Sequence, residues 1–158
     1  MTIIGYRCWI YSGKFRQLMS PLNGTNWPPG EAKTHGRPWL DINLHTHAGI
    51  YANKRYDDLV SGMLTPSGKK FLRTHWWEGP QAEYLPTALV FGTIRLWGKV
   101  VEHTVGYRGE CASVRSLISI SKGPDFDKID SNSLDLNVVR LMYCPLGISA
   151  HAHETNAS

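Results

Sequence analysis

Five polar side chains gather within nine residues near the end of the segment Val90–Ala112, VFGTIRLWGKVVEHTVGYRGECA. They are Glu102, His103, Tyr107, Arg108 and Glu110. A carboxylate between strands can act as a general base if burial raises its pKa, but a glutamate beside an arginine is more often a structural ion pair. We therefore assign no catalytic residue. We expect the cluster to brace a turn beside a binding face to which Trp97 also belongs.

Three histidines form a second candidate site, for a metal. His45 and His47 are two residues apart, and this spacing places both imidazoles on one face of an extended strand. With His35 they could offer the three nitrogen ligands of a catalytic zinc, and Asp41 could supply an oxygen. The alternative is that they are loop histidines with ordinary hydrogen bonds. We predict no cofactor and keep zinc at His35, His45 and His47 as the alternative.

Cationic and aromatic residues also alternate along the chain. Arg7 with Trp9 and Arg95 with Trp97 have the spacing that places both members on one strand face. Further combinations are Arg37 with Trp39, Lys54 and Arg55 with Tyr56, and Arg73 with Trp76 and Trp77. Such surfaces stack nucleic-acid bases and hold phosphates, or form protein interfaces. The alternative is that the rings belong to the core and the arginines face solvent.

Motifs for a nucleophile or a phosphate loop are missing from the sequence. It contains no GxSxG, GxxxxGK[ST] or GxGxxG pattern. Cys8 and Cys111 lie in predicted apolar elements, where a cysteine is usually a small packed hydrophobe. The count of three cysteines is odd and there is no CxxC, which argues against a disulfide framework.

Runs of β-branched and aromatic residues predict the strands that would position these residues. The expected strands are 3–11, 15–20, 47–54, 90–97 and 99–103. The last two are expected to form a hairpin or a bent strand pair, with Gly98 as a bulge or bend and a turn at 104–106. Residues 110–120 fit a helix or a strand.

Two helices are predicted. A weak apolar period indicates one over 55–63, and Ser133 can cap another that begins at Leu134 and stops near Pro145. The polar stretch 65–86, which contains Trp76 and Trp77, is expected to be a long mobile or functional loop. The loop 21–30 is expected to hold Trp27 against the body of the domain.

Composition places these elements in one domain. The chain has 158 residues, of which 42% are hydrophobic and 19% charged. The 15 glycines and nine prolines favour a turn-rich domain over a helix bundle. We predict a single α+β domain over residues 1–149, with an antiparallel β-sheet or partly open barrel and two or three packed helices. Residues 150–158 are expected to be a disordered tail.

The net charge of +4 and the pI of about 9.0 indicate a mildly basic surface. Such a surface attracts nucleic acid or an acidic protein. There is no charged-then-apolar segment at the start and no apolar run of membrane-spanning length, so we expect a cytoplasmic protein without a membrane partner.

Three segments together resemble an uncharacterised family of bacterial and phage-type proteins. They are SPLNGTNWPPGEA (20–32), HAGIYA (47–52) and VFGTIRLWGKVVEHTVGYRGECA (90–112). The family pattern contains WxPG, a CxCGIYA-like segment and GxVxLWGxVvExxxGYRAexA. In place of the two cysteines this chain has His45 and His47. A retained zinc site tolerates that exchange, because both residue types ligate zinc, but a lost site could look the same.

The sequence favours a non-enzymatic binding or regulatory module that contacts nucleic acid or a protein through an aromatic and basic face. A regulator or inhibitor in a phage–host setting is one version of this hypothesis. The alternative is an enzyme, either a zinc-dependent hydrolase that uses the histidines or a transferase that uses a Tyr/Glu site. A third hypothesis is an assembly role with Trp76 and Trp77 at an oligomer contact.

Overall fold

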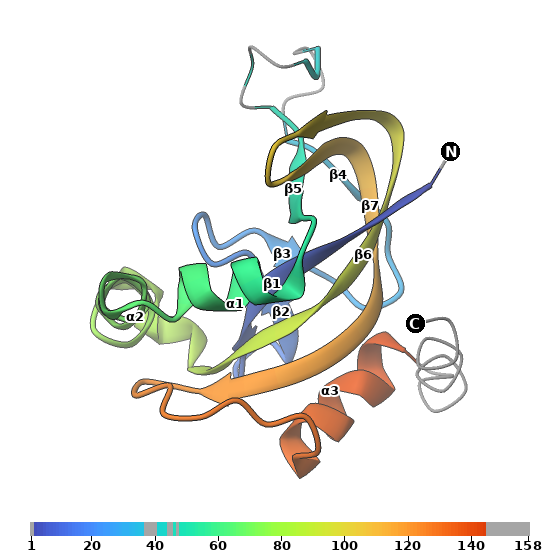
Figure 1. Cartoon of the computed structure of the whole chain (residues 1–158). Coiled ribbons are helices and arrows are strands. Elements are labelled where there is room, and N and C mark those ends of the chain that lie inside the picture. The colour runs from blue at the N-terminus through green and yellow to red at the C-terminus, as the bar shows by residue number, and fades with distance from the viewer. Residues whose placement is uncertain (1, 37–40, 44–45, 47, 145–158) are drawn as a thin grey trace.

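A long antiparallel hairpin forms the spine of the sheet. It consists of β6 (Pro86–His103) and β7 (Gly106–Lys122), joined by a turn at residues 104–105. The computed structural model in Figure 1 describes residues 2–36, 41–43, 46 and 48–144. The predicted turn is confirmed, and so is the strand alternative for 110–120. The prediction that 90–97 and 99–103 pair with each other is wrong, because both belong to β6 and pair with β7.

Gly98 lies at an irregularity in the pairing of β6 with β7. The register of β6 against β7 shifts between Trp97 and Val100, and Gly98 has a φ of +75°. A positive φ is readily adopted only by glycine, so the residue allows a bulge where another would be strained. The predicted bulge is confirmed. It bends the strand without ending its pairing.

The remaining strands close the sheet into a small barrel-like ring. β1 (Ile3–Ser12) pairs along its length with β6, and β5 (Ile50–Asn53) pairs with β7. β1 and β5 meet at a single pair, Tyr6 with Asn53, which completes the circuit β1–β6–β7–β5. A Cβ on Gly5 would lie 2.5 Å from that of Ala52, so the glycine permits this close approach. The predicted α+β domain with an antiparallel sheet or partly open barrel is confirmed.

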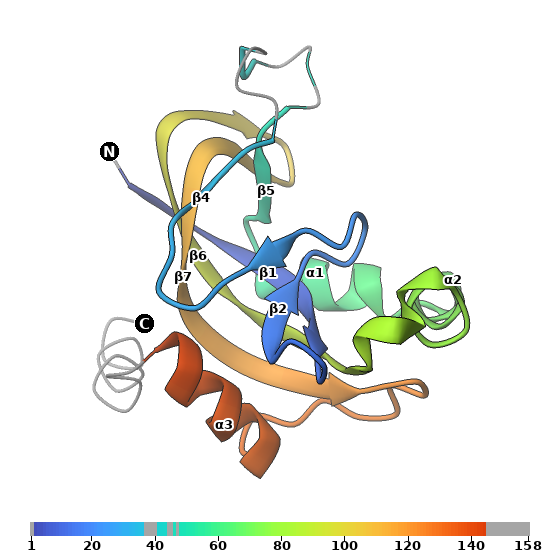
Figure 2. The same ribbon diagram turned by 180° about the vertical axis from the view of Figure 1, so that it is seen from behind.

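Three short strands flank this ring. β2 (Gln17–Met19) and β3 (Asn26–Trp27) continue the sheet from the end of β1, and β4 (Lys33–Thr34) pairs with β7. Figure 2 shows β2 and β4 from behind, on the near side of β1 and β7. On the edge of β1 that faces away from β6, residues 7–9 lie between the pair with β5 and the pairs with β2. No described strand pairs with them there.

Helices cover both faces of the sheet (Figure 1). α3 (Leu134–Tyr143) packs on the face that carries Trp9, as part of one hydrophobic cluster. Its predicted cap is confirmed, because the Ser133 hydroxyl accepts a hydrogen bond from Leu136 N. α1 (Tyr56–Met63), also as predicted, covers the opposite face as part of a second cluster.

The prediction that residues 65–86 form a long loop is wrong. The segment contains α2 (Pro66–Leu72), a π-helical turn (Arg73–Trp77) and a 3-10 turn (Pro80–Tyr84). Thr65 caps α2 by accepting from Gly68 N, and Pro66 occupies the first turn, where its missing N–H costs nothing. Trp76 is fully buried and its Nε1 donates to Pro21 O at 2.8 Å. The segment is therefore held to the body by its buried face.

The predicted tail 150–158 lies outside the described residues. None of the described helices is long and apolar enough to cross a membrane.

Candidate anion-binding groove

A groove of about 620 Å³ lies where the edge of β1 has no strand partner. Its walls come from β5, the turn between β2 and β3, the segment 33–36 and the helix α1. The charged side chains that line it are Arg7 and Lys33, accompanied by His35. Among the described residues that line it there is no aspartate or glutamate. The described walls of the groove are therefore positively charged, without a compensating acid among them.

Arg7 bridges the gap in the sheet. Its Nη1 donates to Tyr51 O on β5 at 2.8 Å, and its Nη2 donates to Ser20 Oγ in the β2–β3 turn at 2.9 Å. The guanidinium carbon lies 4.9 Å from the ring centroid of Trp27, within range of a cation–π contact. Trp9, two residues along the same strand face, packs edge-on to Trp27 at 5.6 Å. The shared face predicted from the spacing of Arg7 and Trp9 is confirmed.

The charge of Arg7 has no carboxylate partner among the described residues. Its Nε is buried and has no hydrogen-bond partner there. Burial lowers the pKa of Arg7 to about 10, so the side chain is still protonated at neutral pH. A guanidinium carries five N–H donors, and the two bonds above engage two of them. The result is a half-buried cation with further donors beside a groove.

Lys33 and His35 line the same groove as this cation. They are two residues apart in an extended segment whose backbone pairs with β7, and His35 N donates to Glu110 O at 3.0 Å. Burial lowers the pKa of Lys33, the charge of Arg7 lowers it further, and Glu31 offsets part of the shift. The two cations therefore feel each other across the groove. Nδ1 of His35 is buried and lacks a partner within the described part of the chain.

The rest of the groove is largely aromatic and apolar. Tyr6 and Trp27 line it, and Leu59 and Met63 of α1 contribute an apolar wall. Tyr6 is held edge-on against Tyr56 at a centroid distance of 6.1 Å. A ligand with an anionic group and a flat or apolar part would find complementary surfaces for both.

Comparison of the chain with family models, curated proteins and solved structures finds no match in any of the three. The resemblance to the bacterial and phage-type family stays a prediction. The description of this site rests on the chain's own residues.

The polar cluster predicted from the sequence lies at the tip of the β6–β7 hairpin. Glu102 pairs with Lys54 at 2.6 Å, and the Lys54 ammonium lies 5.7 Å from the ring centroid of Tyr107. The ring of His103 stacks at a tilt on Tyr51, with centroids 5.2 Å apart. Burial lowers the pKa of His103, and the charges of Arg108 and Lys54 lower it further.

Arg108 and Glu110 have separate structural contacts. Arg108 donates to the backbone carbonyls of Asn43, Thr46 and Ala48, so it anchors the chain that leads to β5. Glu110 accepts from Lys99 N and so supports the Gly98 bulge. The expected glutamate–arginine pair is replaced by the pair of Glu102 with Lys54. The bracing role follows from these contacts, although the partners differ from those expected.

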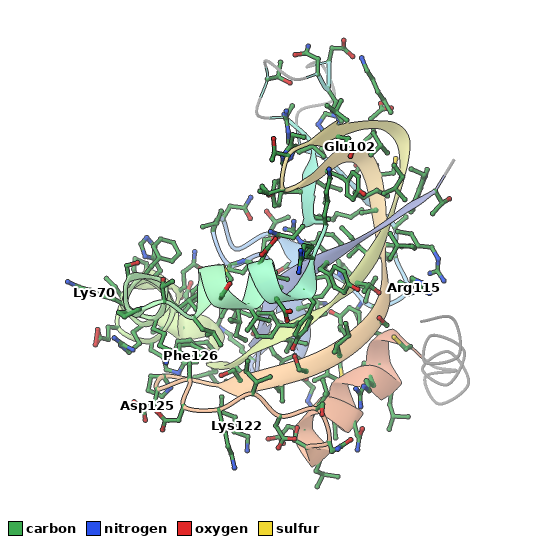
Figure 3. All side chains as sticks on the ribbon, in the orientation of Figure 1. Lys70, Glu102, Arg115, Lys122, Asp125 and Phe126 are labelled. Atoms are coloured by element: carbon green, nitrogen blue, oxygen red, sulfur yellow. The ribbon has the colours of Figure 1, made fainter. Side chains whose placement is uncertain are left out.

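The tryptophans of the predicted binding face do not join this cluster. Trp77 packs edge-on against Phe126 at 5.4 Å, and Figure 3 shows Phe126 and Glu102 at opposite ends of the hairpin. Trp76 is fully buried, and Trp97 is half-buried on β6 beside the bulge. The predicted set therefore divides into at least two separate locations.

Two of the predicted zinc ligands, His45 and His47, lie outside the described residues. The described part of the chain contains no group of three metal-ligating side chains. His35 lies in the groove with Arg7 and Lys33, whose charges would repel a metal cation there. Zinc at the three histidines stays a prediction.

Sequence reasoning identified the Arg7 and Trp9 pair but missed the groove. The overlooked signal was a charged residue inside an otherwise apolar strand, IIGYRCWIY. Lys33 and His35 share the same alternating spacing in a segment with no clear period.

Proposed function

We propose that the protein is a binding module for single-stranded nucleic acid. In this proposal Arg7, Lys33 and His35 hold a phosphate and the aromatic side of the groove receives a base. The observation that carries the proposal is the half-buried Arg7 cation, without a carboxylate partner among the described residues, beside a groove whose described lining contains no acid.

Partial burial of the Arg7 charge costs free energy, and an opposite charge with good hydrogen bonds offsets that cost. An anion in the groove would accept from the unused donors of Arg7 and bring the missing negative charge. Charge-assisted contacts between arginine and phosphate are short and strong.

A single strand fits these surfaces better than a duplex. Its bases can turn away from the backbone and stack on aromatic side chains, which contributes about 1–3 kcal/mol per base. Tyr6 is half-buried and lines the same groove as the cations, so one nucleotide could contact both. In a duplex the bases are stacked inside. The net charge of +4 would attract the polyanion from a distance.

Fluorescence anisotropy with a labelled strand of about ten deoxythymidines tests the proposal, at low and at moderate salt. We expect binding at low salt that weakens as salt rises, with a slope of about −0.7 for each phosphate contact. Lys33→Ala should weaken binding by about tenfold, since it removes one charge from the groove.

Lys128→Ala is the matched control, because it removes the same charge from an exposed position outside the groove. Absence of binding by the wild-type protein at low salt would refute the proposal. An equal loss in the two variants would instead place the strand on the general basic surface. Binding of an acidic peptide in preference to the strand would support the protein-partner alternative.

A further inference from the structure

We infer that the cationic part of the groove takes a terminal phosphate monoester, such as the phosphorylated end of a nucleic-acid strand, in preference to an internal phosphodiester. This inference rests on the proposed function and specifies which group of the strand enters the site. It follows from the charge, the donors and the shape around Arg7.

Charge balance is the first step. Arg7 and Lys33 together bring two positive charges, and no acid is present among the described lining residues. A phosphate monoester carries about −1.5 to −2 charges at neutral pH, whereas a phosphodiester carries only one. The monoester therefore compensates this pair of cations more completely.

The donor inventory is the second step. Arg7 Nη1 and Nη2 each carry a second N–H beyond the bonds to Tyr51 O and Ser20 Oγ. Lys33 Nζ has three N–H donors, and one of them donates to Asn26 O at 2.5 Å. A monoester presents three oxygens that are not esterified and a diester presents two. The additional oxygen gives the unsatisfied donors another acceptor.

The shape of the site is the third step. The Arg7 side chain spans the gap between β5 and the β2–β3 turn, because it bonds to Tyr51 O on one side and Ser20 Oγ on the other. The same Ser20 Oγ also accepts from Trp27 Nε1 at 2.9 Å, which fixes the bridge on that side. Both bonds run from the guanidinium, so its Nη groups are held in place between the two flanking segments. In this inference a terminal phosphate meets these groups end-on, and the strand need not continue past them.

The test compares two strands of about ten deoxythymidines that differ only in a terminal phosphate, by competition anisotropy. We expect the phosphorylated strand to bind at least about tenfold more tightly, equivalent to one additional strong contact. The ratio of the two affinities should fall towards one in Lys33→Met and in His35→Phe. It should stay unchanged in Lys128→Met. Circular dichroism confirms that each variant is folded. Arg7 is left intact because its bridge holds two parts of the sheet together.

Thymidine 5′-monophosphate provides a second probe, with thymidine as its control. If the monophosphate changes the His35 ring ¹⁵N signals and thymidine does not, the phosphate subsite is supported directly. Equal affinity for both strands would overturn the inference and leave the proposed function standing. Binding of the monophosphate but of neither strand would overturn the proposed function and leave the subsite standing. No binding of any probe would refute both.

Discussion

Tyr143 offers a quantitative test of how α3 supports the groove. Its hydroxyl accepts a hydrogen bond from Leu18 N at 2.7 Å and donates one to Trp27 O. It thereby joins the helix to β2 and β3, which are connected by the turn that carries Ser20. All three contact residues are buried, and burial raises the pKa of Tyr143 to about 12, so the hydroxyl keeps its proton under ordinary conditions.

Tyr143→Phe would leave a buried N–H and a buried carbonyl without their partner. Each orphaned group costs about 1–3 kcal/mol, so we expect the free energy of unfolding to fall by about 2–6 kcal/mol. That is a large part of the 5–15 kcal/mol typical of a domain. Urea denaturation at pH 7 measures the change. Terminal-phosphate binding should also weaken, because Trp27 and the turn would be held less firmly.

Tyr11→Phe is the matched control. The Tyr11 hydroxyl donates only to Met142 Sδ, at 3.7 Å, and a thioether is a weak acceptor. Its loss should cost less than about 1 kcal/mol. If Tyr143→Phe costs no more than Tyr11→Phe, the hydroxyl does not hold α3 to the sheet as described.

Three further predictions concern other parts of the chain. The pKa of His103 is lowered in the folded state, so the unfolded state takes up a proton first as the pH falls below the ordinary value of 6.5. The free energy of unfolding should therefore fall below that pH, which urea midpoints would show. An equal fall in His103→Phe would contradict this. Gly98→Ala should lower the free energy of unfolding by about 1–2 kcal/mol, because Gly98 has a φ of +75°. Gly62 lies in α1, where an added Cβ would meet open space, so Gly62→Ala should raise the free energy of unfolding by about 0.5–1 kcal/mol. Equal changes in the two variants would argue against strain at the bulge. Burial raises the pKa of the Cys8 thiol to about 12, so iodoacetamide at pH 8 should modify the half-buried Cys111 first, and equal labelling rates by mass spectrometry would contradict that.

Local signals predicted most of the fold. The apolar alternation of 3–11 and 90–103 marked two main strands, and Ser133 marked the start of α3 because its side chain can satisfy the first turn. Pairing was harder to predict. The segments 90–97 and 99–103 look like separate strands around Gly98, and only the long partner β7 makes them continuous.

The prediction of a loop around Trp76 was wrong for a different reason. The prolines and glycines of this region are typical of a loop, but they occupy helix ends: Pro66 lies in a first turn and Gly79 separates two turns. A Cβ on Gly79 would lie 2.3 Å from Thr74 O, so the glycine is needed for close packing. Turn-forming residues alone could not distinguish a mobile loop from a chain of short helices.

The groove could not be predicted, because it arises from an incomplete pairing of strands that are distant in sequence. β5 meets β1 at one residue pair, Tyr6 with Asn53, and β2 begins to pair with β1 only at Ile10. Arg7 bonds to the segments on both sides of this gap. An uncharged side chain could pack there without the cost of partly burying a cation. Three bonds, including that of Trp27 to Ser20, hold the cation in place. Its remaining Nη donors, in the groove that Lys33 and His35 also line, give this charge a role that packing alone would not require.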